Sequence, residues 1–293
     1  MLRLCLTLFL FQFLGSVVLA AGRFFSRTPD ANPWLVGALV AASAGCCGVG
    51  LYAVRKPWEF EGFSRRFLWL ILFVYLGLTL GVFVQHFAGK PGDGQLALRI
   101  SVGALCFQGV LLALLPRWLR DHGETWSSGF GLRQRPVRAV GLGLVLGLVF
   151  FKLGEWLQGL SMEIISRLGA KPEVQPAVEA LKNSSAWQDR AALAAVAVVL
   201  APLAEELLFR GILYPAIKRG GWPRLALWGT SLLFALIHVN LPTFVPLLLF
   251  ALTLTLLYER TGNLLAPLTA HALFNILNFA RFLWTEARLG PPG

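Results

Sequence analysis

The chain has 293 residues, of which 56% are apolar and 14% are charged, whereas soluble domains carry about 25% charged residues. The shortfall comes from long uncharged stretches, several of which approach or exceed the ~20 residues that a helix needs to cross a bilayer. This composition excludes a soluble enzyme, a secreted disulfide-rich domain and a disordered chain. The net charge of +11 sits in short loops between apolar stretches, which is typical of membrane proteins, so we expect the bilayer and no nucleic acid as a partner.

Nine apolar segments predict an all-α fold, a polytopic transmembrane helical bundle of about eight to nine helices. In chain order they run roughly over residues 4–21, 34–54, 67–87, 95–115, 137–160, 191–219, 224–241, 242–258 and 263–284. The first segment also has features of a signal peptide, with Arg3 before it and Ala20 at its end. We favour a retained anchor because the apolar stretch is long for a signal peptide, and cleavage is the alternative.

The positive charge is unevenly divided between the two sides of the predicted bundle. If the nine segments alternate in direction, fourteen Lys and Arg residues lie in loops on the N-terminal side and nine lie on the other side. The positive-inside rule then places the N-terminus in the cytoplasm. We therefore expect an integral, multi-pass membrane protein, which in a bacterial cell would lie in the inner membrane.

The chain divides into two parts of different character. Residues 1–136 hold transmembrane segments of unknown role, and residues 137–293 hold the groups with candidate chemistry. The loop from about 161 to 190 is the only long polar stretch between segments. Gly143 and Gly147 form a G-x-x-x-G pair, which predicts a close contact between two helices.

Two adjacent carboxylates lie inside the sixth apolar segment, where ionisable side chains are costly and usually mark function. Glu206 precedes Arg210 by four residues, so the two share a helix face and are expected to form an ion pair. Glu205 points about 100° away from Glu206, which leaves it free to face a cavity. The alternative is that both glutamates only neutralise arginines of neighbouring helices.

Two further polar pairs follow at the same spacing. Phe234 and His238 are four residues apart, as are His271 and Asn275, so each pair shares a helix face. A single pair of this kind usually makes hydrogen bonds between helices. Counted from the adjoining turns, Glu205 and His238 both lie roughly 21 Å along their helices and His271 roughly 12 Å. These depths predict that the polar groups meet in one cavity that opens to the cytoplasm.

Together, these residues resemble the three motifs of the CPBP family, which contains the type II CAAX prenyl endopeptidases and bacteriocin-processing proteins. The motifs, as they stand in this chain, are Glu205-Glu206-x-x-x-Arg210, Phe234-x-x-x-His238 and His271-x-x-x-Asn275. The resemblance covers roughly 90 residues, and every motif position agrees in identity, order and internal spacing. It implies a helical-bundle intramembrane endopeptidase that hydrolyses peptide bonds of membrane-associated substrates.

The resemblance also assigns roles to the candidate residues. By position, Glu205 and His238 would activate water, while His271 and Asn275 would stabilise the oxyanion. The structural support of the site would come from Glu206, Arg210 and Phe234. The chemistry is reasonable, because a carboxylate in apolar surroundings can serve as a general base and amide and imidazole donors can form an oxyanion hole.

A metal site is the alternative mechanism. Glu205, His238 and His271 would form the two-histidine, one-carboxylate set that catalytic zinc uses, although no H-E-x-x-H motif is present. We favour water activated without a cofactor and keep zinc or another divalent metal as the alternative. The expected partner is a peptide or protein substrate at the membrane, with or without a lipid group.

Two other functions compete with a protease. One is a non-catalytic immunity or scaffold protein of the same fold, which would not need the complete polar set. The other is a proton-coupled transporter that uses Glu205 and the histidines as a relay. Transporters often contain internal repeats, and the sequence shows none. Within the protease hypothesis, CAAX processing and the maturation of peptides or bacteriocins are both open.

Overall fold

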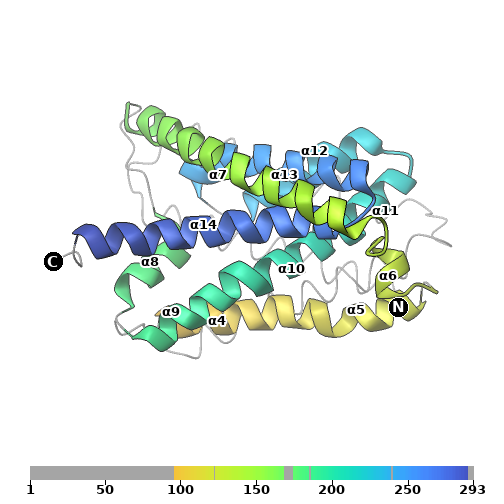
Figure 1. The fold of residues 1–293 in the computed structure, drawn as a ribbon, viewed down its shortest axis with the longest axis horizontal. Coiled ribbons are helices and arrows are strands. Elements are labelled where there is room, and N and C mark those ends of the chain that lie inside the picture. The colour runs from red at the N-terminus through yellow and green to blue at the C-terminus, as the bar shows by residue number, and fades with distance from the viewer. Residues whose placement is uncertain (1–95, 122, 168–173, 185, 239, 290–293) are drawn as a thin grey trace, which may run out of the picture. The chain divides into compact units, whose positions relative to one another are not determined.

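In the computed structural model, the described residues are 96–121, 123–167, 174–184, 186–238 and 240–289, and every regular element within these ranges is a helix (Figure 1). This agrees with the predicted all-α class. The three predicted segments that end at residues 21, 54 and 87 lie outside the described residues. The total of eight to nine helices and the division at residue 136 therefore stay predictions.

The described helices follow the six remaining predicted segments closely. The segment expected at 95–115 comprises α4 (Leu96–Ala104), the π-helical η1 (Leu105–Gly109) and α5 (Val110–Asp121). After the short α6 (Trp126–Gly129) come α7 (Pro136–Arg167) and α8 (Pro176–Asn183). One continuous helix then comprises α9 (Trp187–Ala195), η2 (Val196–Leu200), α10 (Ala201–Glu206), η3 (Leu207–Leu213) and α11 (Tyr214–Arg219). The last three helices are α12 (Pro223–Leu236), α13 (Leu241–Thr261) and α14 (Leu265–Leu289).

Three helices in the described part of the chain are long and apolar enough to cross a membrane. They span Pro136–Arg167, Trp187–Arg219 and Leu241–Thr261. On the first of them, α7, large apolar side chains point outward, with Val145 60% and Val149 57% exposed. Such a face is unfavourable in water and favourable against lipid, which supports an integral membrane protein.

Several predicted ends are displaced, since α7 continues to Arg167, into the loop predicted at 161–190, and α8 lies within that loop. The displacement that bears on the site is at the seventh segment. The segment expected at 224–241 ends earlier, because α12 stops at Leu236 and His238 follows it in a turn. Asn240 caps the next helix, and its side-chain oxygen accepts a hydrogen bond from the backbone N–H of Thr243 at 3.2 Å. With Pro242 in the first turn of α13, this sequence starts a new helix and cannot continue the old one. His238 is therefore held at a helix junction and not within a helix.

Among the described helices, α7 and α14 make the most extensive contact, and two glycines make it possible. A Cβ atom added at Gly143 would lie 2.5 Å from the carbonyl oxygen of Ala266, and one at Gly147 would lie 2.9 Å from that of Ala270. The predicted G-x-x-x-G contact is thus confirmed. It fixes the backbone of α14 next to His271.

Gly147→Leu is therefore expected to destabilise the protein by about 1–3 kcal/mol, because a large side chain forces two close-packed helices apart. The midpoint of thermal unfolding of the purified protein measures the effect. Gly141→Leu is the matched control, since a Cβ atom at Gly141 meets nothing within 4 Å. Equal loss in the two variants would show that helix propensity, and not close packing, sets the requirement at Gly147.

The loop before α7 is fastened to the turn between α13 and α14. Asn263 donates its side-chain N–H to the carbonyl oxygen of Gln134 at 2.7 Å, and the N–H of Leu264 bonds the carbonyl of Phe130 at 3.0 Å. Phe130 is buried and lies so close to Gly211 that a Cβ atom there would be 2.6 Å from its ring. The loop thereby holds the π-helical η3 in place.

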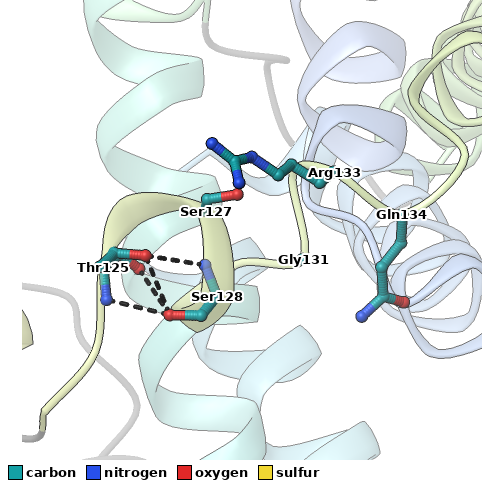
Figure 2. A pocket seen from close by; sticks show the side chains of 6 residues that line it. All are labelled: Thr125, Ser127, Ser128, Gly131, Arg133 and Gln134. Carbon is teal, nitrogen blue, oxygen red and sulfur yellow. Dashed lines mark hydrogen bonds between the residues drawn. The ribbon is translucent and has the colours of Figure 1, made fainter.

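A shallow hollow lies on the surface of the same loop (Figure 2). Its lining residues are Thr125, Ser127, Ser128, Gly131, Arg133 and Gln134. Thr125 and Ser128 form a capping box, in which each hydroxyl accepts the backbone N–H of the other residue at 3.0–3.2 Å. Figure 2 shows these bonds within the first turn of α6. These two hydroxyls therefore serve to start α6.

Candidate active site

A fully buried carboxylate lies at the centre of the candidate site. Oε1 of Glu206 accepts a hydrogen bond from Nη1 of Arg210 at 2.8 Å, and this confirms the ion pair that the i, i+4 spacing predicts. The same oxygen lies 2.8 Å from Nδ1 of His271 on α14. This second contact joins residues 65 positions apart in sequence, so no local spacing could reveal it. Glu206 therefore connects α10 to α14.

The positive charge of Arg210 is paired, and its guanidinium N–H groups have several described partners. Besides Glu206, its Nη2 donates to the carbonyl oxygen of Ala251 at 3.0 Å and its Nε to Oγ1 of Thr255 at 3.3 Å. Its guanidinium carbon lies 4.8 Å from the centre of the Phe234 ring. A buried charge is tolerated only when it is paired and its donors are used. Arg210 thus fixes the π-helical η3 to α13.

The contact with Glu206 also orients the imidazole of His271. A carboxylate only accepts hydrogen bonds, so Nδ1 of His271 carries the proton that is donated to Glu206. The other ring nitrogen, Nε2, then points toward Glu205, whose Oε2 lies 3.9 Å away. This separation is too long for a direct hydrogen bond and suits two groups that bind one water or substrate atom between them.

Two carboxylate oxygens at this place have no partner in the described part of the chain. They are Oε2 of Glu205 and Oε2 of Glu206, and both are buried. Buried polar atoms in folded proteins are nearly always hydrogen-bonded, and exceptions often mark a ligand or a catalytic role. The helix is π-helical both before and after α10, and such wide turns are frequent at functional sites. Both features point to a polar ligand beside Glu205.

Aromatic rings surround the two histidines. Phe234 is completely buried, and its ring centre lies 4.9 Å from that of His238 and 5.7 Å from that of His271. Phe250 meets His271 edge-on at 5.6 Å. Nδ1 of His238 is 2.7 Å from the carbonyl oxygen of Phe234, so this nitrogen is the donor and Nε2 remains as the acceptor. The rings form an apolar wall, and apolar surroundings strengthen electrostatic interactions within the site.

The structure brings most of the predicted residues together but does not test their roles. Phe234 contacts both histidines and Arg210, as a supporting residue would. Among the described residues, no hydrogen bond or ion pair joins His238 to Glu205. Asn275 lies one turn after His271, and its side-chain N–H bonds the carbonyl oxygen of Ala197 in η2 at 2.7 Å. The water-activating roles of Glu205 and His238 and the oxyanion roles of His271 and Asn275 stay predictions.

The predicted three-ligand metal set does not form in this structure. Within the described ranges, no three His, Cys, Asp or Glu side chains are grouped closely enough to hold one metal ion. As they are placed, Glu205, His238 and His271 do not form a three-ligand set, and we derive no step through a metal.

Comparisons with known proteins agree with the motifs. Residues 187–277 match the family model described as "Type II CAAX prenyl endopeptidase Rce1-like", and this confirms the predicted resemblance to the CPBP family. The uncharacterized protein YpbD of Bacillus subtilis (strain 168) is 37% identical over 81 residues, which are 26% of this chain and 39% of that protein. The chain therefore matches well under half of this relative's length. No solved structure matches the chain.

Proposed function

The chain carries a region of the type II CAAX prenyl endopeptidase family at residues 187–277, and from this premise we propose that it is an intramembrane endopeptidase. One observation carries the proposal. The unpartnered Oε2 of Glu205 lies 3.9 Å from Nε2 of His271 in a buried site walled by aromatic rings. A carboxylate beside an oriented imidazole is a suitable arrangement for general acid–base catalysis.

The proposed reaction requires a second proton on the imidazole of His271. Nδ1–H of His271 is donated to Glu206, so donation to an anion needs a further proton on Nε2. With Glu205, Glu206 and Arg210 charged, that proton also makes the buried group neutral, and burial of net charge is unfavourable. Glu205 then serves as the base of the proposed reaction.

The proposed reaction uses these groups in sequence. Glu205 and His238 activate a water molecule. Glu205 takes a proton from this water, and the water oxygen attacks the carbonyl carbon of the scissile peptide bond. The oxyanion of the tetrahedral intermediate receives hydrogen bonds from Nε2–H of His271 and from the Asn275 amide. The C–N bond then breaks, and Glu205 returns its proton to the leaving amine. Glu206 and Arg210 hold His271 in the required orientation.

Activity is expected to survive removal of metal ions. Glutamate and histidine can position water by hydrogen bonds alone, and the described site lacks a three-ligand set. The rate of cleavage of a quenched fluorescent peptide by the purified protein, before and after dialysis against a strong chelator, measures this. Loss of activity that stoichiometric zinc restores would overturn the metal-free mechanism and make Glu205, His238 and His271 ligands.

The proposed substrate is a membrane-associated peptide with or without a lipid group, and CAAX processing is the first case to test. Cleavage of a peptide that ends in a farnesylated Cys-a-a-X sequence, compared with its unprenylated counterpart, separates lipid-dependent processing from the maturation of unlipidated peptides.

We also propose a multi-pass protein with a cytoplasmic N-terminus. Labelling of single cysteines placed at the two termini, from each side of a sealed vesicle, tests this orientation.

A further inference from the structure

A buried amide outside the three motifs faces the helix that carries Glu205. Gln108 lies in the π-helical η1 and is only 8% exposed, and no group in the described part of the chain donates to its Oε1. A buried carbonyl oxygen without a hydrogen-bond donor is unfavourable, so its position calls for an explanation. A structural role would normally show a partner within the fold.

The neighbours of Gln108 on its own helix show which way its face is turned. Ala97, Ser101, Leu111 and Leu115 recur at helical spacing around Gln108, and all are buried. Leu111 and Leu115 belong to one apolar cluster with Ala204 and Leu208, which lie on either side of the Glu205–Glu206 pair. η1 itself packs directly against α10. The face that carries Gln108 therefore meets α10.

Glu205 lies beside the same face of α10. It directly follows Ala204 and precedes Leu208 by three residues, which places it next to the cluster that α5 covers. Glu206 and Arg210 bond His271 and Thr255, whereas Oε2 of Glu205 makes no described hydrogen bond and lies 3.9 Å from Nε2 of His271. Glu205 and Gln108 thus share two properties on facing elements: each is largely buried, and each has a side-chain oxygen without a donor.

From this juxtaposition we infer that Gln108 is a substrate-binding residue that holds a peptide group of the substrate next to Glu205. A glutamine amide presents one acceptor and two donors. It can therefore accept the N–H of a peptide group through Oε1 and donate to the carbonyl oxygen of that group through Nε2. The inference rests on the proposed protease function and adds a residue from before the family-matched region, which begins at residue 187.

The test compares Gln108→Met with Ser101→Ala. Methionine keeps the length of the side chain and removes both hydrogen-bonding groups, while Ser101 is equally buried and also has an unpartnered oxygen but lies on α4, two turns away. Binding of a fluorescent farnesylated Cys-a-a-X peptide is followed by anisotropy, and cleavage by kcat and KM. For Gln108→Met we expect an approximately tenfold rise in Kd and KM with kcat little changed, and for Ser101→Ala no change.

Thermal unfolding separates substrate binding from a structural role. Since Gln108 has no described partner for its Oε1, the methionine variant should unfold at the same temperature as the wild type or higher. A lower midpoint together with unchanged Kd and KM would overturn the inference, and so would wild-type binding and cleavage in Gln108→Met. A wild-type protein that neither binds nor cleaves the peptide would instead remove the proposed function, and this inference with it.

Discussion

Glu205→Gln is expected to lower the rate of peptide cleavage by about 10²–10⁴-fold, the usual contribution of a general base. The amide has the shape of the carboxylate but cannot take a proton from water. Because no described group donates to Oε2 of Glu205, the substitution removes no hydrogen bond from that oxygen, and the folded state should be as stable as the wild type. Turnover and the midpoint of thermal unfolding, measured on the same purified sample, give both quantities.

Glu163→Gln is the matched control for that experiment. Glu163 is also a carboxylate on a helix long and apolar enough to cross a membrane, α7, but it is exposed and pairs with Arg167 at 2.5 Å. It should retain wild-type turnover. Wild-type turnover in Glu205→Gln would refute the assignment of the base.

Glu206→Ala is expected to act mainly on stability, with a loss of about 3–5 kcal/mol, the range measured when one partner of a buried ion pair is removed. Arg210 is 1% exposed and would lose its carboxylate, and Nδ1 of His271 would lose its acceptor. Yield of folded protein and the unfolding midpoint measure the effect. Turnover per folded molecule should also fall, because His271 is no longer oriented.

The double variant Glu206→Ala/Arg210→Met distinguishes an unpaired charge from a lost packing contact. Removing both members of the pair should restore part of the stability that Glu206→Ala loses, and the two substitutions should therefore be strongly non-additive. Additive losses would show that the pair does not act as a unit. A Glu206→Ala protein as stable as the wild type would contradict the structural role of Glu206.

The local features of the site were predictable from spacing alone. The i, i+4 relation of Glu206 and Arg210 predicts their ion pair, and the G-x-x-x-G pair predicts the close contact of α7 with α14. Both follow from helical periodicity, which the sequence displays directly. The placement of the apolar segments was predictable for the same reason, since long uncharged stretches have few alternatives to a helix in a membrane.

The contacts between distant segments were not predictable in this way. The bond between Glu206 and His271 depends on how α10 and α14 pack, and nothing in either sequence motif specifies the partner. The end of α12 was misplaced because apolar residues continue through Ile237 and Val239, while the capping by Asn240 decides where the next helix starts. The packing of Gln108 against α10 likewise becomes visible only once η1 and α10 are placed side by side.

We propose that water activated by Glu205 hydrolyses a peptide bond at the membrane. The most direct measurement incubates the wild type and Glu205→Gln, each reconstituted in lipid nanodiscs with a chelator in ¹⁸O-labelled water. The substrates are farnesylated Cys-a-a-X, unprenylated and membrane-spanning peptides, and mass spectrometry detects the products. We predict that the wild type cuts at least one of these peptides and places one ¹⁸O atom in the new carboxyl group, while Glu205→Gln releases no product. Absence of cleavage by the wild type would refute the protease function, and equal cleavage by both proteins would refute Glu205 as the base.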